Sequence, residues 1–450
     1  MLVFVFSFFT VFTFFFLDFF SFHFFCLFFF LISFFFSFFF YFDLFSFFFS
    51  SIFFLDLMSS CLILLTFWIL GLIFLMSYFY YHNSFFWSSF CFVVSFLGFN
   101  LFLCFCVSSI LLFYIFFELS LLPTLFLILG WGSQPERLQA GMYMMLYTIV
   151  CSLPFFVVLF FYYFVSGSFF FFFPFSVFSL FFFSIFFFVF ISLCFFVKVP
   201  VYFFHLWLPK AHLEAPVSGS MVLAGILLKL GCYGLLRFYS VFYFFNFFFS
   251  VFYFVFSLLG GVLTSFICLR QVDMKGLVAY SSVGHMSIFI GGLGSGSFLG
   301  WSGCLMIIIS HGLCSSALFC LVTIVYEYVG SRSLYMTKGF ICFFPFLSLW
   351  WFFFSIFNMG APPSFNFFGE LVLVGSMLSY SFFSIFFIFF LGFLSCVYSI
   401  YLYVCSQHGF CLSLYNFFCC CKSRFYLLMF LHFFPIFFFF FNLDIFSSWC

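Results

Sequence analysis

The chain has 450 residues, of which 68% are hydrophobic, 5% are charged and 112 are phenylalanine. A soluble domain carries about a quarter charged residues and cannot hide this much apolar surface from water. The formal net charge is only +1, so no overall field would attract nucleic acid or an acidic substrate. This composition excludes a soluble enzyme, a secreted disulfide scaffold and a disordered tail, and it indicates an all-α polytopic membrane protein.

The apolar stretches predict about 14 transmembrane spans. Their approximate bounds are 1–17, 23–42, 61–82, 85–106, 108–131, 138–164, 176–208, 216–238, 241–268, 275–292, 298–325, 340–378, 381–405 and 425–442. Two of them, 176–208 and 340–378, exceed one straight crossing and contain internal prolines, which predicts two broken helices. The first span has no basic region before it, so we expect a membrane helix and not a cleaved targeting peptide. No Gly/Ser-rich linker divides the chain, and we expect a single membrane domain over 1–450.

The basic residues between the predicted spans lie almost entirely on one side of the membrane. Loops after the odd-numbered spans carry Arg137, Lys210, Arg270, Lys275, Arg332, Lys338, Lys422 and Arg424. The opposite side carries only Arg237. The positive-inside rule places the basic loops on the cytoplasm-like side, with both termini on the other side.

The 20 cysteines are scattered through apolar segments, and no Cys-x-x-Cys pair occurs among them. This spacing argues against a zinc, iron–sulfur or dithiol site. The sequence also contains no Gly-x-Gly-x-x-Gly motif, which argues against a dinucleotide site. We therefore expect neither a metal site nor a cofactor-binding site in this chain.

Four charged residues lie well inside predicted spans, away from their ends, namely Glu118, Lys198, Lys229 and Glu370. A charge at the centre of a membrane helix costs about 2.5 to 3.5 kcal/mol on insertion scales, so such residues usually serve a function. Snorkelling toward the surface could accommodate Lys198, which lies two residues before a proline, but it does not suit Lys229 or Glu118 in mid-span. A static ion pair would explain two of the charges but hardly two acids and two bases on four helices. We interpret the set as proton-transfer groups, and we expect Glu118 to lie within ion-pair reach of Lys198.

Two histidines, His285 and His311, lie in later spans between Lys229 and Glu370 in the sequence. Buried histidines are more often hydrogen-bonded core residues than relay groups, so the pattern fits both interpretations about equally. His205 and His212 flank the charged turn at Lys210 and are expected to be structural or entrance residues.

Several motifs together resemble the signature of the antiporter-like subunits of respiratory complex I, the NADH:ubiquinone oxidoreductase of mitochondria. The longest runs from Lys198 to Pro216 with the sequence KVPVYFFHLWLPKAHLEAP. The other motifs that carry the resemblance occupy 117–124, 131–137, 219–221, 227–231, 270–275, 280–285, 311–316 and 362–370. The resemblance covers about 108–380 and leaves the first hundred residues assigned only by continuity.

The resemblance implies a role for each membrane charge. Glu118 would pair with Lys198 on the first broken helix, Lys229 would be the central lysine, and Glu370 would end the route. His285 and His311 would lie between the last two. An acid at the final position is similar to the chain 4 group of the family, whereas chains 2 and 5 usually carry lysine there.

The resemblance also implies a fold of 14 helices with two inverted five-helix repeats. The N-terminal helices would occupy 1–84, the first repeat 85–238, the second repeat 241–405 and the C-terminal helix 406–450. The implied function is proton translocation in the membrane arm, with FMN, iron–sulfur clusters and ubiquinone in partner subunits. Other membrane-arm subunits and membrane lipids, cardiolipin among the candidates, would be the partners, and the mitochondrial inner membrane the location, with basic loops in the matrix.

Two other functions remain open from the sequence. A sodium/proton antiporter subunit of the same family would use similar helices and lysines, and co-purification with a redox complex would separate the two cases. A purely structural subunit with a decayed relay is disfavoured because all four membrane charges are retained.

Overall fold

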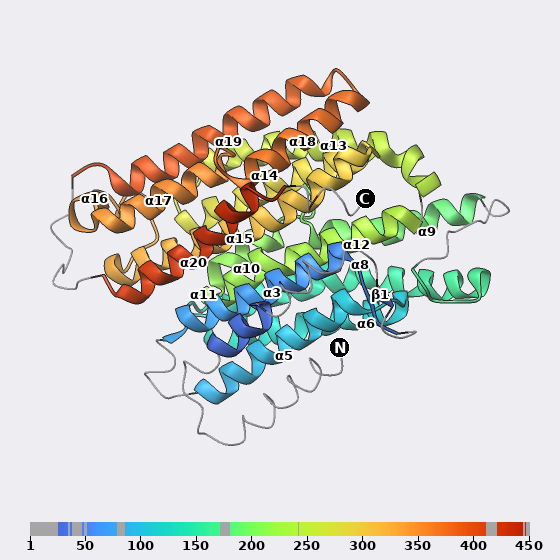
Figure 1. Cartoon of the computed structure of the whole chain (residues 1–450), viewed down its shortest axis with the longest axis horizontal. Coiled ribbons are helices and arrows are strands. Elements are labelled where there is room, and N and C mark those ends of the chain that lie inside the picture. The colour runs from blue at the N-terminus through green and yellow to red at the C-terminus, as the bar shows by residue number, and fades with distance from the viewer. Residues whose placement is uncertain are drawn as a thin grey trace. The chain divides into compact units, whose positions relative to one another are not determined.

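The computed structural model describes residues 26–34, 37, 47–48, 52–78, 86–171, 181–241, 243–410, 421–443 and 446. The predicted span 1–17 and most of the span 23–42 lie outside these residues. Within them the chain is built almost entirely of helices (Figure 1). The helices form two compact units, which comprise 1–198 with 214–242 and 199–213 with 243–450.

The first unit contains a short hairpin and most of the N-terminal helices. Its antiparallel strands are β1 (Phe47–Phe48) and β2 (Phe54–Leu55). Its helices are α3 (Leu57–Met76), α5 (Trp87–Cys106), α6 (Ile110–Leu119), α7 (Leu121–Trp131), α8 (Arg137–Ser166), α9 (Phe181–Lys198), α11 (Val217–Val222), the π-helical turn η2 (Leu223–Leu227) and α12 (Leu228–Val241).

The second unit contains the C-terminal helices together with the segment 199–213. That segment includes all but the last residue of α10 (Trp207–Glu214). The other helices are α13 (Tyr243–Leu269), α14 (Met274–Gly294), α15 (Phe298–Val329), α16 (Phe340–Phe343), α17 (Pro345–Asn358), α18 (Phe365–Tyr380), α19 (Ser384–Gln407) and α20 (Ser423–Phe440).

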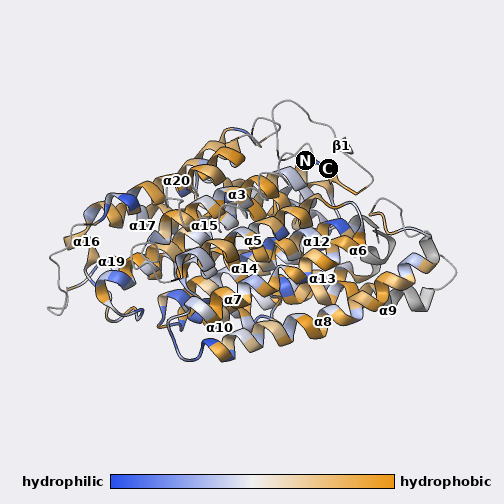
Figure 2. Ribbon diagram, turned by 90° about the horizontal axis from the view of Figure 1, so that it is seen from below, coloured by the Kyte–Doolittle hydropathy of each residue, from blue (hydrophilic) through white to orange (hydrophobic). Residues whose placement is uncertain are grey.

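Ten helices in the described part of the chain are long and apolar enough to cross a membrane. Figure 2 shows the apolar residues running along the helices, with most hydrophilic residues near helix ends. The most apolar stretch of α15 is entirely buried, whereas only 33% of the corresponding stretch of α8 and of α19 is buried. Exposed phenylalanines such as Phe164 and Phe389 are favourable where the surrounding solvent is hydrocarbon.

The structure confirms both predicted breaks. One long span divides into α9 and α10, which are separated by residues 199–206 around Pro200. The other divides into α17 and α18, which are separated by residues 359–364 around Pro362 and Pro363. Proline lacks an N–H and clashes with the preceding turn, so the helix ends before it in both places.

The structure differs from the predicted spans in two places. The span predicted to begin at 61 begins at Leu57, because Asp56 caps the helix and exchanges hydrogen bonds with Ser59. The span predicted as a regular helix over 216–238 contains the π-helical turn η2. The sequence carries no signal for that turn.

Two short main-chain pairings recur in equivalent places. In the first clasp, Ile110 N–H donates to Phe169 O at 2.8 Å, and Phe171 N–H donates to Ser108 O at 3.2 Å. The first clasp therefore joins the start of α6 to the end of α8.

The second clasp joins the start of α14 to the end of α15 in the other unit. Here Met274 N–H donates to Arg332 O at 3.1 Å, and Leu334 N–H donates to Val272 O at 2.9 Å. Its residues lie 163 or 164 positions after those of the first clasp, as from 110 to 274 and from 169 to 332.

Candidate functional site

Lys198 is the last residue of α9, the first segment of the first broken helix. Its side chain is buried, with 4% exposure. The ammonium donates to the main-chain oxygen of Phe117 at 3.0 Å and lies 3.1 Å from the centre of the Phe117 ring. A carbonyl and an aromatic face thus replace water around this charge.

Glu118 follows Phe117 on α6 and attracts the Lys198 charge electrostatically. Its carboxylate accepts a hydrogen bond from Ser152, while its buried Oε1 has no hydrogen-bond partner. The described residues contain no hydrogen bond or ion pair between Glu118 and Lys198. The prediction of a direct pair is therefore wrong for this structure, because the ammonium reaches the neighbouring carbonyl instead.

Lys229 lies in the first turn of α12, immediately after the π-helical turn, and its side chain has 0% exposure. Its ammonium donates to the main-chain oxygen of Ala224, within η2, at 2.8 Å. In that turn Leu228 N–H bonds to Leu223 O, five residues back. Such wide turns frequently occur at functional sites. They shift main-chain carbonyls away from the positions that these groups have in a regular α-helix.

In the second unit, Glu370 and His285 come together. Glu370 Oε1 lies 3.3 Å from His285 Nδ1, with side-chain exposures of 19% and 2%. Neither ring nitrogen of His285 makes a hydrogen bond of good geometry to a described residue. The two atoms are therefore within ion-pair distance, but their alignment does not meet the geometry of a hydrogen bond.

Asn366 holds the Glu370 carboxylate from one helical turn away. Its Nδ2 donates to Glu370 Oε1 at 2.9 Å and to Phe357 O at 3.2 Å. Its Oδ1 accepts from Ser310 Oγ on α15 at 3.0 Å. One amide thus connects the carboxylate, the end of α17 and the neighbouring helix across the break.

Gly360, in the break itself, closes over the same carboxylate. Its φ of +71° is a conformation that side chains rarely adopt, and an added Cβ would collide with the Glu370 carboxyl group. The backbone of the break can therefore approach Glu370 only because residue 360 is glycine.

His311 extends this group along α15. Its side chain is buried, with 3% exposure, and its ring centre lies 5.5 Å from that of His285. The structure therefore brings together three of the predicted residues, His285, His311 and Glu370. The other three, Glu118, Lys198 and Lys229, belong to the first unit.

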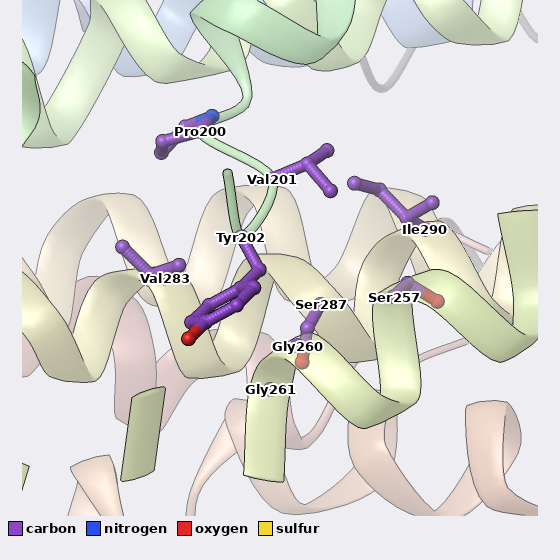
Figure 3. Close-up of a pocket in the computed structure, with 9 residues that line it drawn as sticks. All are labelled: Pro200, Val201, Tyr202, Ser257, Gly260, Gly261, Val283, Ser287 and Ile290. Carbon is purple, nitrogen blue, oxygen red and sulfur yellow. The ribbon is translucent and has the colours of Figure 1, made fainter. Parts of the chain in front are cut away.

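A small pocket lies beside the first break, within the second unit (Figure 3). Tyr202 descends from the segment after Pro200 onto α13 and α14, where the hydroxyls of Ser257 and Ser287 line the pocket. Gly260 permits this packing, since a Cβ there would collide with Tyr202, and Gly261 likewise leaves room for the Ser287 hydroxyl.

His205 and His212 are packing residues in this unit. The ring of His205 stacks on Tyr202 at 5.2 Å, and that of His212 stacks on Phe319 at 4.5 Å. The two residues are 5% and 0% exposed, which favours the predicted structural role over the predicted entrance role.

Sequence reasoning missed Asn366, Ser310 and Gly360 as site residues. Neutral side chains and a glycine do not stand out in a hydropathy pattern as charges do. The available signal was weak: an asparagine and a glutamate one turn apart, just after two prolines, can meet on one helix face.

The described residues contain no group of three or more His, Cys, Asp or Glu side chains that could hold a metal ion. Carboxylates, imidazoles and ammonium groups, all present among the six candidate residues, are groups that can accept and release protons.

The sequence of this chain is similar to those of known membrane proteins. Residues 107–395 match a family described as NADH:quinone oxidoreductase/Mrp antiporter, TM. The chain is 47% identical over 309 residues to NADH-ubiquinone oxidoreductase chain 4 of Ceratitis capitata, covering 69% of each chain. It is 48% identical over 309 residues to chain 4 of Locusta migratoria, again covering 69% of each.

Two solved structures share the fold. A chain of "Respiratory complex I from Thermus thermophilus with bound NADH" matches with a TM-score of 0.78 and 21% identity, over 86% of this chain and 81% of that one. A chain of the Mrp complex from Dietzia sp. DQ12-45-1b matches with a TM-score of 0.73 and 18% identity, over 86% of this chain and 42% of that one. At these identities the likeness concerns the fold alone.

Proposed function

The chain belongs to the family of membrane subunits shared by NADH:quinone oxidoreductases and Mrp antiporters, and on that premise we propose that it moves protons in the membrane arm of respiratory complex I. The observation that carries the proposal is the group of the buried His285 and His311 with the half-buried Glu370, in which an acid and an imidazole lie 3.3 Å apart inside an apolar unit. The curated relatives named chain 4 support the assignment to NADH:ubiquinone oxidoreductase.

The proposed route uses the six predicted residues in two sets. Glu118 and Lys198 load a proton in the first unit, and Lys229 carries it onward. His285 and His311 then receive it and deliver it to Glu370, the terminal carrier. The Glu370–His285 contact supports the last step, because proton transfer needs donor and acceptor within hydrogen-bond reach or joined by one water.

The chain would supply no redox centre of its own. Electron transfer from NADH to ubiquinone would occur in partner subunits that hold FMN and iron–sulfur clusters, and it would couple to this chain through charge or conformational changes. Other membrane-arm subunits and the surrounding lipids, cardiolipin included, are the proposed partners.

We also propose the full architecture of 14 helices with two inverted five-helix repeats. The two clasps support the repeats, because each joins the second and third spans of its set at the same register, where α6 and α7 together form one span (Ile110–Trp131). A second matched contact supports them too: Cys104 Sγ lies 3.9 Å from Phe113 O, and Cys268 Sγ lies 4.0 Å from Leu277 O. These residues are again 164 positions apart, as from 104 to 268.

Replacement of Lys229 tests the proposal. Lys229→Ala should abolish or severely reduce redox-driven proton uptake into liposomes while the complex still assembles, because the central carrier is lost. Lys229→Arg should also pump poorly, since a guanidinium does not release its proton. Lys338→Ala, the same type of change in the connection between α15 and α16, is the matched control and should pump normally.

Full proton-to-electron stoichiometry in Lys229→Ala would overturn the relay and leave this lysine a structural residue. Co-purification decides between the two members of the family. Isolation of the chain with a complex that oxidises NADH supports the proposal, and isolation with a sodium/proton antiporter assembly would contradict it.

A further inference from the structure

Three polar side chains form a stripe on α12, at intervals of four residues. These are Lys229, Tyr233 and Arg237, which lie on one face of the helix. Lys229 and Tyr233 are 0% and 1% exposed, whereas the Arg237 side chain is 13% exposed and its partner Asp56 is 22% exposed. The stripe therefore leads from the buried lysine toward the membrane surface at the C-terminal end of α12.

Tyr233 has both sides of its hydroxyl occupied. The hydroxyl donates to Phe105 O at 3.3 Å and accepts a hydrogen bond from the Arg237 guanidinium. The guanidinium carbon lies 5.0 Å from the centre of the Tyr233 ring. To pass a proton along the stripe, this hydroxyl would have to accept a proton from one neighbour and donate its own to the other.

Arg237 is held in place by Asp56, the residue that caps α3. Its Nη2 lies 2.6 Å from Asp56 Oδ1. The Asp56 carboxylate is itself fixed by hydrogen bonds with Ser59 at the start of α3. Burial raises the pKa of Asp56, but the nearby Arg237 charge and the hydrogen bonds from Arg237 and Ser59 outweigh it and leave the pKa below its usual value.

The stripe therefore ends in a group that cannot take part in proton exchange. A lysine ammonium releases its proton when it is desolvated, but a guanidinium remains charged in proteins. A fixed arginine in a narrow passage also repels a positively charged proton carrier, as it does in water-selective pores. A pump needs such a barrier on any side where its carrier must not release protons.

We propose that Arg237, anchored by Asp56, is a plug that prevents a proton on Lys229 from escaping along α12 to the nearby membrane surface. The plug rests on the proposed function, since it protects the carrier that the relay assigns to Lys229. In this proposal Arg237 acts as a barrier to protons. It does not carry a proton, and it does more than form an ion pair that stabilises the ends of α3 and α12.

The test measures passive proton flux, without NADH, through the assembled complex in liposomes under a potassium diffusion potential. Arg237→Gln should raise the passive flux several-fold and lower the ratio of pumped protons to electrons. Arg237→Lys should leak as well, because an ammonium can exchange its proton. Arg270→Gln is the matched control: it makes the same change at an exposed arginine between α13 and α14, outside the stripe, and the membrane should stay tight.

The double variant Arg237→Gln with Lys229→Ala locates the leak. If the leak passes through Lys229, this variant should be as tight as the parent complex. A leak of equal size in the double variant would overturn the proposal, and so would an Arg237→Gln or Arg237→Lys complex as tight as the parent. Failure of the relay would show separately, as redox-driven pumping that survives Lys229→Ala.

Discussion

At the scale of single residues, Asn366 organises the polar group around Glu370. Its amide bonds the carboxylate, the Phe357 carbonyl and the Ser310 hydroxyl. The Glu370 oxygen that it binds is also the one that faces His285. Loss of a buried partner leaves a polar group unsatisfied, which costs about 1 to 3 kcal/mol for each group. Asn366 thus fixes the position of the Glu370 carboxylate.

We expect Asn366→Leu to slow redox-driven proton transfer by about tenfold or more, because it removes the amide that orients Glu370. Asn366→Asp should be at least as damaging, since it places a second carboxylate beside the first. The measurement is the proton-to-electron ratio of the assembled complex in liposomes. Asn442→Asp, at the turn that follows α20, makes the same chemical change outside the site, and pumping equal to that control would contradict the role of Asn366.

Charge in an apolar background was the signal that identified Glu118, Lys198, Lys229 and Glu370 from the sequence. It could not give their partners, as the expected pair of Glu118 and Lys198 demonstrates. Main-chain carbonyls carry no sequence signature, yet Phe117 O and Ala224 O are what the two ammonium groups bind. Charge in an apolar background therefore identifies the charged residues, but it does not identify the groups that they contact.

At the scale of elements, the second break shapes the site. α17 ends at Asn358 and α18 begins at Phe365, and the residues between them bring Gly360 against Glu370. Ser364 Oγ accepts from Phe367 N–H and caps α18. The break therefore positions backbone and carboxylate together, in addition to interrupting the helix.

Gly360→Ala should lower pumping and reduce the amount of assembled complex. A left-handed conformation costs an L-residue about 1 to 2 kcal/mol, and the new methyl group also displaces the Glu370 carboxyl group. Gly375→Ala, on the same α18 with nothing within 4 Å of the added Cβ, is the control and should assemble and pump normally. Comparable yield and stoichiometry for the two variants would refute the importance of the close approach.

The two breaks were predictable because prolines and span length both mark them. The π-helical turn before Lys229 was not, since Leu223–Leu227 reads as ordinary apolar helix. The start of α3 at Leu57 was not predicted, because the capping box formed by Asp56 and Ser59 begins the helix ahead of its most apolar stretch.

At the scale of the whole molecule, the expected orientation in the membrane rests on the distribution of basic residues. Arg237, on the sparsely charged side, is paired with Asp56, which reduces the net positive charge there. The exposed Arg270 lies among the eight basic residues of the other side. From this charge asymmetry we expect the basic loops to face the matrix and the termini to lie in the intermembrane space.

Protease access to mitoplasts tests this orientation. A C-terminal tag should be cleaved by protease added from outside, while the connection at Arg270 should be cut only after the membrane is opened. Protection of the tag in intact mitoplasts, or cleavage at Arg270 there, would mean that the number of spans is wrong.

Membrane location, the breaks and the family could all be predicted from composition and motifs. The division into two units, with 199–213 assigned to the second, could not, because it depends on contacts between residues far apart in the chain. Tyr202 against Gly260 is one such contact, and no local pattern encodes it.

The clasps have a consequence for how this sequence can change over time. Their bonds join main-chain atoms, so they form equally well whichever side chains stand at those positions. Substitution can therefore convert lipid-facing positions to phenylalanine, as at Phe164 and Phe389, without loosening the scaffold. At Lys229, Gly360 and Asn366, by contrast, the side chain or its absence makes the contact itself, so substitution there removes the contact.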